Sequence, residues 1–208
     1  MEIADLVLFL VAAFAIAVTP GPGILYVAAR TMAGGRGVGY ASSLGTGLGG
    51  LVHVAAGAVG VSAILLASAE LFTLLKLLGA LYLVFLGWRA WREAGAPLEI
   101  LGSTPRGRGQ AFRDGVVVEA LNPKTAAFFL AFIPQFVDPA AGGLAIQFAL
   151  LGTISVVLNT AVDFVVVVLA TTLRERLTTR HDIVRRIRRL SAALLCGLGV
   201  SLALARRS

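Results

Sequence analysis

The sequence predicts an all-α polytopic membrane protein with six transmembrane helices, arranged as two inverted-topology three-helix repeats. Three observations support this fold class. The 208 residues are 58% hydrophobic and only 14% charged, whereas a soluble domain carries about 25% charged residues. Six apolar runs are long enough, or nearly long enough, to cross a bilayer. Prolines interrupt the first run of each half, at Pro20 and Pro22 and again at Pro123.

The predicted spans follow the uncharged runs, because about 20 apolar residues suffice for one crossing. The sixth span is the weakest, since its uncharged part extends only from Leu190 to Ala205, and a five-span alternative would omit it. The six spans are residues 5–29, 38–68, 71–91, 112–136, 144–172 and 189–206.

A single membrane transporter domain is expected over residues 1–208. Repeat 1 covers about residues 1–92 and repeat 2 about 112–208, with a cytoplasmic linker at about 93–111 that is rich in Gly, Pro and Arg. Short matches between the halves support an inverted repeat. The matches are Leu44-Gly45-Thr46 with Leu151-Gly152-Thr153, Ala80 with Ala192, and Leu86-Gly87 with Leu198-Gly199.

Basic residues give the predicted orientation. Most of the 18 Lys and Arg residues lie in the first, third and fifth loops, and positive residues favour the cytoplasmic side. Both termini are therefore predicted to lie outside. Because the charges cluster between apolar runs, the net charge of +7 indicates orientation in a lipid bilayer and no nucleic-acid partner.

The first proline break is Thr19-Pro20-Gly21-Pro22-Gly23, inside the apolar run from Leu6 to Ala29. Proline has no N–H, so these prolines free the carbonyls of Ile16 and Val18. The glycines let the backbone turn where other residues would clash. In hydrocarbon, freed backbone groups are tolerated only where protein or a polar cavity satisfies them. The break therefore predicts a cavity.

The second break, Leu121-Asn122-Pro123-Lys124, interrupts the run from Gly115 to Val137. Asn122 is predicted to cap a new half-helix that has Pro123 as its first residue, because Asn is a strong N-cap and Pro fits the first turn. Pro123 also frees the carbonyl of Glu119. Two Pro-interrupted spans at corresponding positions of two halves indicate the binding site of a transporter.

The chemistry of these breaks favours a zwitterionic ligand. In an inverted repeat the two half-helix N-termini converge on the middle of the membrane, and a helix N-terminus suits a carboxylate. The carbonyls freed by the prolines, together with Glu119 or Asp163, suit an ammonium. An amino acid carries both groups, so the predicted substrate-binding residues include all four of Pro20-Gly21-Pro22-Gly23, as well as Asn122 and Pro123.

Several motifs of the chain resemble the lysine-exporter and homoserine/threonine-efflux family (LysE/RhtB) of bacterial inner-membrane amino-acid exporters. The resemblance covers nearly the whole chain, although family members often have Asn at the position of Gly23 and Asp at that of Gly50. The motifs are Pro20-Gly21-Pro22-Gly23, Gly45 to His53, Leu78 to Leu83, Leu121-Asn122-Pro123-Lys124, and Phe128 to Asp138 with Pro134-Gln135-Phe136.

The resemblance implies a multi-pass protein of the inner membrane that exports a small amino acid or related metabolite, coupled to the proton gradient. Amino acid and protons are then the expected small-molecule partners, and no cofactor is expected. The resemblance indicates a class of transporter and does not identify the cargo.

Glu119 and Asp163 are the acids that fall well inside predicted spans. A charge at the centre of a transmembrane helix costs about 2.5–3.5 kcal/mol on insertion scales, so its presence needs a reason. One interpretation is that one or both bind a substrate ammonium or carry the coupling proton. The other is a structural ion pair with Lys124 or an arginine, or a position of Asp163 nearer the cytoplasm.

Three further polar residues are candidates for the site. Lys124 either neutralises a deep acid or holds a substrate carboxylate, and Asn159 in the fifth span is expected to line the same space. His53 belongs to a stripe of small residues in the second span and is either a packing residue or a site of proton coupling. The stripe predicts close helix packing and a possible surface for a homo-oligomer; it comprises Ala41, Gly45, Gly49, His53 and Gly57.

Other classes of function are disfavoured by what the chain lacks. A cysteine redox relay needs two thiols, and there is one cysteine. A zinc hydrolase needs a ligand cluster such as His-Glu-x-x-His, and the two histidines are far apart in sequence. We therefore expect no enzyme and no metal site. An exporter of a metal or other ion, or a membrane scaffold without transport, remain the alternatives.

Overall fold

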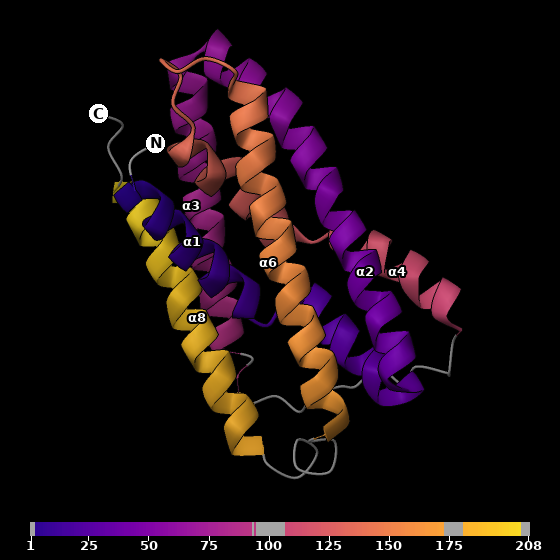
Figure 1. Ribbon diagram of the computed structural model, residues 1–208. Coiled ribbons are helices and arrows are strands. Elements are labelled where there is room, and N and C mark those ends of the chain that lie inside the picture. Colours follow the sequence, from indigo (N-terminus) through magenta and orange to yellow (C-terminus); the bar gives the residue numbers. More distant parts are fainter. Residues whose placement is uncertain (1–2, 93, 95–106, 173–180, 205–208) are drawn as a thin grey trace.

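The computed structural model describes residues 3–92, 94, 107–172 and 181–204, and these are helical apart from short connections (Figure 1). The all-α prediction is confirmed for this part of the chain. The helices are α1 (Ile3–Val18), α2 (Pro22–Ala67), α3 (Ala69–Arg92), α4 (Arg108–Ala120), α5 (Pro123–Ala127), the π-helical η2 (Phe128–Phe132), the 3-10 helix η3 (Ile133–Phe136), α6 (Leu144–Thr172) and α8 (His181–Leu204).

Helix α2 consists of two segments that meet at Gly35. The φ angle of Gly35 is 77°, in the left-handed region that glycine adopts without a steric penalty. Residues 22–34 form a short segment, and residues 36–67 form a long one that turns back along it in Figure 1. The first predicted span, residues 5–29, is thus made of α1 and the short segment of α2.

By length and composition, three described helices can each cross a membrane: Pro22–Gly60 within α2, Glu70–Arg92 within α3, and Leu144–Thr172. The last has the bounds predicted for the fifth span. A fourth candidate is the pair Arg108–Ala120 and Pro123–Phe136, which is bent by 42° at the second break. Ile3–Val18 and Ala192–Leu204 are apolar but shorter.

The last helix differs from its prediction at the N-terminal end. Residue 189 was the predicted start of the sixth span, with the preceding arginines in a loop, but α8 begins at His181. Arg185 and Arg186 therefore lie on the helix and are exposed. Hydropathy located only the apolar part, whereas arginine has nearly the helix propensity of leucine and does not end a helix.

Two groups of helices form the molecule. Helices α4 and α6 both pack along α2, whereas α3 packs along α8. Helix α1 contacts both α6 and α8 and so joins the groups (Figure 1). In Figure 1 the α2–α3 junction and the connection before α6 lie at one end of the molecule, while the Gly35 turn and the C-terminal end of α6 lie at the other.

The small-residue stripe of α2 brings the helices into close contact, as predicted. A Cβ on Gly45 would overlap the carbonyl oxygen of Phe112, and one on Gly49 would lie 2.9 Å from Glu119 Cβ and 3.0 Å from Ala120 N. The stripe therefore packs within one chain, with Gly45 and Gly49 against α4 and Gly57 against Phe148 of α6. A homo-oligomer through this face stays a prediction, and the packing leaves these glycines buried inside the chain.

Candidate functional site

Both predicted proline breaks are present. Helix α1 ends at Val18 and α2 begins at Pro22, while α4 ends at Ala120 and α5 begins at Pro123. The predicted cap is also confirmed: the side chain of Asn122 accepts a hydrogen bond of 3.0 Å from the backbone N–H of Lys124, with proline in the first turn of α5. This cap sets the direction in which α5 leaves the break.

The two breaks lie against each other. A Cβ on Gly21 would be 3.2 Å from both Cδ and Cε of Lys124, and one on Gly23 would overlap Glu119 Oε2. The Gly23 Cβ would also be 3.7 Å from Asn122 Nδ2. The glycines of the first break therefore leave room for the charged side chains of the second. The sequence predicted convergence of the breaks but not these two contacts.

Two of the carbonyls freed by proline have side-chain partners from distant parts of the chain. Lys124 Nζ donates to Ile16 O at 3.0 Å and to Thr19 O at 2.8 Å. His53 Nε2 lies 2.9 Å from Glu119 O. Backbone N–H groups of Thr19 and Asn122 also donate to these freed carbonyls, at 3.2 and 3.0 Å. The freed carbonyls of Ile16 and Glu119 are thus satisfied by protein, as a membrane setting requires.

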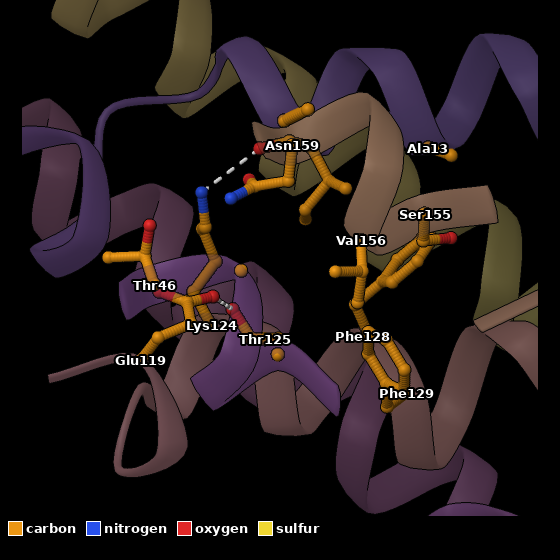
Figure 2. Close-up of a pocket in the computed structure, with 14 residues that line it drawn as sticks. Ala13, Thr46, Glu119, Lys124, Thr125, Phe128, Phe129, Ser155, Val156 and Asn159 are labelled. Carbon is orange, nitrogen blue, oxygen red and sulfur yellow. Dashed lines mark hydrogen bonds between the residues drawn. The ribbon is translucent and has the colours of Figure 1, made fainter. Parts of the chain in front are cut away.

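The carboxylate of Glu119 occupies the N-terminal end of α5. It is buried and accepts from Asn122 Nδ2 at 2.9 Å. It also accepts from Thr125 Oγ1 at 2.6 Å (Figure 2). An anion is favoured at this position because a helix N-terminus exposes unpaired N–H groups. The carboxylate-binding end that the sequence predicted therefore holds a carboxylate of the chain itself.

Asp163 is fully buried between α6 and α2. Thr46 Oγ1 donates to Asp163 Oδ2 at 2.8 Å, whereas Oδ1 has no hydrogen-bond partner. An unpaired buried carboxylate oxygen is costly. Within the described ranges, no ion pair is found between Asp163 or Glu119 and a basic side chain, whereas Arg30 pairs with Asp114 at 3.1 Å.

A cavity of about 30 Å³ lies between the breaks and α6 (Figure 2). This volume holds about two water molecules, so an amino acid does not fit without a change of conformation. Its walls come from both halves of the chain. They are formed by Ala13, Ile16, Ala17, Thr46, Gly47, Gly50, Glu119, Lys124, Thr125, Phe128, Phe129, Ser155, Val156 and Asn159.

Three of the predicted site residues, Glu119, Lys124 and Asn159, line this cavity directly. The motif Pro20-Gly21-Pro22-Gly23, together with Asn122 and Pro123, shapes the breaks behind it without lining it. His53 lies outside the wall, on the Glu119 carbonyl, with its ring 5.7 Å from that of Phe129.

Asp163 also lies outside the wall, behind Thr46. Two residues with important contacts, Thr46 and Thr125, were not among the predicted site residues. The pattern Asn-x-x-Thr from Asn122 to Thr125 is not a capping box, which has Glu or Gln at the last position, so no sequence signal indicates that Thr125 binds Glu119. No local signal relates Thr46 to Asp163, which is 117 residues away.

Comparison with known proteins points to one family. The family model described as LysE type translocator matches residues 14–206. A relative from Salmonella typhimurium, named homoserine/homoserine lactone efflux protein, is 35% identical over 81% of this chain and 80% of its own. An uncharacterized membrane protein from Vibrio cholerae is 29% identical over 99% of this chain and its own full length.

No solved structure matches the chain. The family match nevertheless spans nearly all of it, and it includes both breaks and every residue that lines the cavity except Ala13. Translocators and efflux proteins are transporters, so the family match confirms the expectation that the protein is not an enzyme. The chain is a membrane protein that belongs to the LysE type translocator family.

Proposed function

We propose that this protein exports a small amino acid or related zwitterionic metabolite across the bacterial inner membrane, in exchange for protons. The observation that carries the proposal is the meeting of opposite charges at the two breaks: Glu119 and Lys124 line one buried cavity. Intramembrane ionisable groups mark substrate or ion pathways. The Salmonella relative, named for homoserine efflux, supports an amino acid as the cargo.

Six spans in two inverted repeats are part of this proposal, with repeat 1 over about residues 1–92 and repeat 2 over about 112–208. Reciprocal contacts between α3 and α8 support it. A Cβ on Gly199 would lie 2.7 Å from Ala80 O, and a Cβ on Gly87 would lie 2.8 Å from Ala192 O. Ala80 and Gly87 of repeat 1 are the positions that matched Ala192 and Gly199 of repeat 2 in the sequence. The two contacts are therefore equivalent by the symmetry of the repeats.

Within this proposal the two deep acids have different roles. Glu119 has a donor on each carboxylate oxygen, and these bonds help hold the two sides of the second break together. Asp163 has a hydrogen-bond donor on Oδ2 and none on Oδ1. A proton bound at Oδ1 would neutralise the buried carboxylate at the oxygen that has no partner. We assign proton coupling to Asp163. A role for His53 stays a prediction, since its Nε2 is engaged by the Glu119 carbonyl.

Alternating access needs a contact that can open on each side of the cavity. Toward the Gly35 end, Arg30 pairs with Asp114, and the Tyr26 hydroxyl donates to Ala111 O at 2.6 Å. These bonds connect the short segment of α2 with α4. Toward the other end, aromatic rings pack together, with Phe128 and Phe132 stacked at 5.2 Å. Alternating access then requires these two contacts to open in turn.

Proteoliposomes loaded with radiolabelled homoserine test the function. We expect efflux to exceed that of protein-free liposomes, to accelerate when the outside is made acidic, and to lose this acceleration with a protonophore. A mixture of labelled neutral amino acids covers a cargo other than homoserine. If no amino acid leaves faster than from protein-free liposomes, the proposed function is wrong.

A further inference from the structure

The ammonium group of Lys124 is bound by the C-terminal end of α1. Its Nζ donates to Ile16 O at 3.0 Å and Thr19 O at 2.8 Å, and both residues are buried. Carbonyls at a helix C-terminus attract cations because the helix dipole is negative there. Pro20 removes the N–H that would otherwise compete for Ile16 O. The two carbonyls together form a built site for a primary ammonium.

We propose that these two carbonyls are the ammonium subsite for the cargo, and that Lys124 competes with the cargo ammonium for them. The inference rests on the proposed function, because it places an amino acid in the cavity. Ile16 and Lys124 both line that cavity, so a cargo bound there lies next to the residue that supplies one of the two carbonyls. The Lys124 side chain thus occupies the position that we assign to the ammonium group of the cargo.

The side chain of Lys124 passes between a glycine of the first break and a polar residue of α6. It lies along Gly21, and a Cβ there would be 3.2 Å from both Cδ and Cε of Lys124, so the glycine is what lets the lysine reach the carbonyls. It also faces Asn159 of α6, and Figure 2 shows the nitrogen-bearing ends of the two side chains directed toward each other. A rotation about the four-carbon stem is what takes the ammonium off the carbonyls of α1, and it accompanies the change of conformation that admits the cargo.

Charge balance then selects the class of ligand. Glu119 and Lys124 bring one negative and one positive charge to the cavity wall. A zwitterion adds no net charge: its ammonium takes the two carbonyls, and the displaced Lys124 ammonium pairs with its carboxylate. A simple alkylammonium would leave two cations in a buried site with no new anion, which is costly. The wild-type site therefore discriminates against ligands that lack a carboxylate.

Replacement of the lysine tests the subsite. In Lys124→Ala the deleted atoms have the shape of propylammonium, so we expect propylammonium to raise the melting temperature of the variant saturably. N,N,N-trimethylpropylammonium, which has the charge but no N–H donor, should have no such effect. The wild-type protein and Lys76→Ala, which alters the other lysine of the chain, should not respond to either compound.

Ligand preference separates this role from a merely structural one. For the wild-type protein, the concentration that gives half of the maximal stabilisation should be at least tenfold lower for homoserine than for propylammonium. For Lys124→Ala, propylammonium should have the lower half-saturating concentration of the two. N-trimethylated homoserine should not bind the wild-type protein. If Lys124 had only a structural role, its replacement would lower the affinity for both ligands and leave their order unchanged. An unchanged order in Lys124→Ala therefore overturns the inference. Binding of N-trimethylated homoserine to the wild-type protein would overturn it as well.

The outcome is distinguishable from failure of the proposed function. If the wild-type protein exports no amino acid but Lys124→Ala binds propylammonium, the function is wrong and the ammonium subsite stands. If homoserine is exported and propylammonium has no effect on the variant, the subsite is wrong. Should Lys124→Ala fail to accumulate, cells are grown with propylammonium: recovery of folded protein supports the subsite, and its absence overturns it.

Discussion

At the scale of single residues, the buried charges are the features that need explanation. Glu119, Lys124 and Asp163 are all buried, yet each has a different set of partners. Lys124 binds backbone carbonyls, Glu119 binds two side-chain donors, and Asp163 has one donor and one unpaired oxygen. The residue type alone predicted that these positions matter, but not which partner each would have.

Asp163→Asn is predicted to uncouple transport from the proton gradient while the fold is kept. The asparagine oxygen can still accept from Thr46, so only the site at Oδ1 is lost. We expect homoserine exchange across proteoliposomes to continue and its acceleration by an acidic exterior to disappear. Asp138→Asn, in an exposed connection, is the matched control. Full coupling in the double variant Asp163→Asn, Glu119→Gln at equal expression would exclude carboxylate-borne proton transfer.

Glu119 and Lys124 are predicted to be energetically coupled, because each balances the charge of the other at one buried site. Glu119→Gln and Lys124→Met should each lower the melting temperature. The double variant should be less destabilised than the sum of the two, with a coupling free energy of about 0.5–3 kcal/mol. A double-mutant cycle in detergent measures it, and strict additivity would contradict the charge-balance argument.

At the scale of elements, the proline breaks were the most predictable feature. Their position depends on the missing N–H of proline and the cap formed by Asn122, which act within one turn of helix. The start of α8 at His181 was not predicted, because hydropathy reports where a helix is apolar and says nothing of its charged extension. The turn at Gly35 was likewise not predicted, because glycine adopts positive and negative φ angles about equally readily and the residue type does not show which one it has.

Healing either break is predicted to abolish export while the protein still inserts. In the double variant Pro20→Ala/Pro22→Ala, a new backbone N–H binds the Ile16 carbonyl in place of Lys124. In the double variant Asn122→Ala/Pro123→Ala, the cap of α5 is lost. A continuous helix satisfies its own backbone, so the fold survives. Efflux from proteoliposomes should fall at least tenfold, with Pro139→Ala in an exposed connection as control. Wild-type rates in the healed variants would show that the prolines only kink packed helices.

The packing of α2 on α4 is predicted to depend on Gly49. Gly49→Ala places a Cβ 2.9 Å from Glu119 Cβ and 3.0 Å from Ala120 N, and the backbone of α4 cannot move aside without separating the helices. We expect a loss of about 1–3 kcal/mol in stability, as for other overpacked cores. Gly60→Ala, where the added Cβ meets nothing within 4 Å, is the control and should be neutral or slightly stabilising. Equal melting temperatures for the two variants would contradict the close contact.

At the scale of the whole molecule, the two ends of the helical array lie together. The start of α1 and the end of α8 are at the same side in Figure 1, and the two helices are in contact. An even number of crossings places both termini on one side of a membrane. The charge distribution, with arginines concentrated in alternate loops, predicts that this side lies outside the cytoplasm.

A reporter fused after Ser208 is therefore predicted to be active only in the periplasm. Alkaline phosphatase, which needs an oxidising compartment, should be active at this position, and green fluorescent protein should be dark. A second fusion at Gly107, before α4, should give the opposite pattern. Cytoplasmic activity of the reporter after Ser208 would remove the sixth crossing and leave the inverted repeat incomplete.

The sequence by itself determined the membrane class, the proline breaks and the cap at Asn122, because hydropathy, a missing N–H and a capping side chain act over neighbouring residues. Only the tertiary structure decided that Lys124 binds Ile16 O, 108 residues away, and that Thr46 binds Asp163. The partner of a freed carbonyl or a buried acid depends on which helices approach most closely. That approach is set by glycine contacts such as Gly23 against Glu119, between segments whose pairing no local pattern encodes.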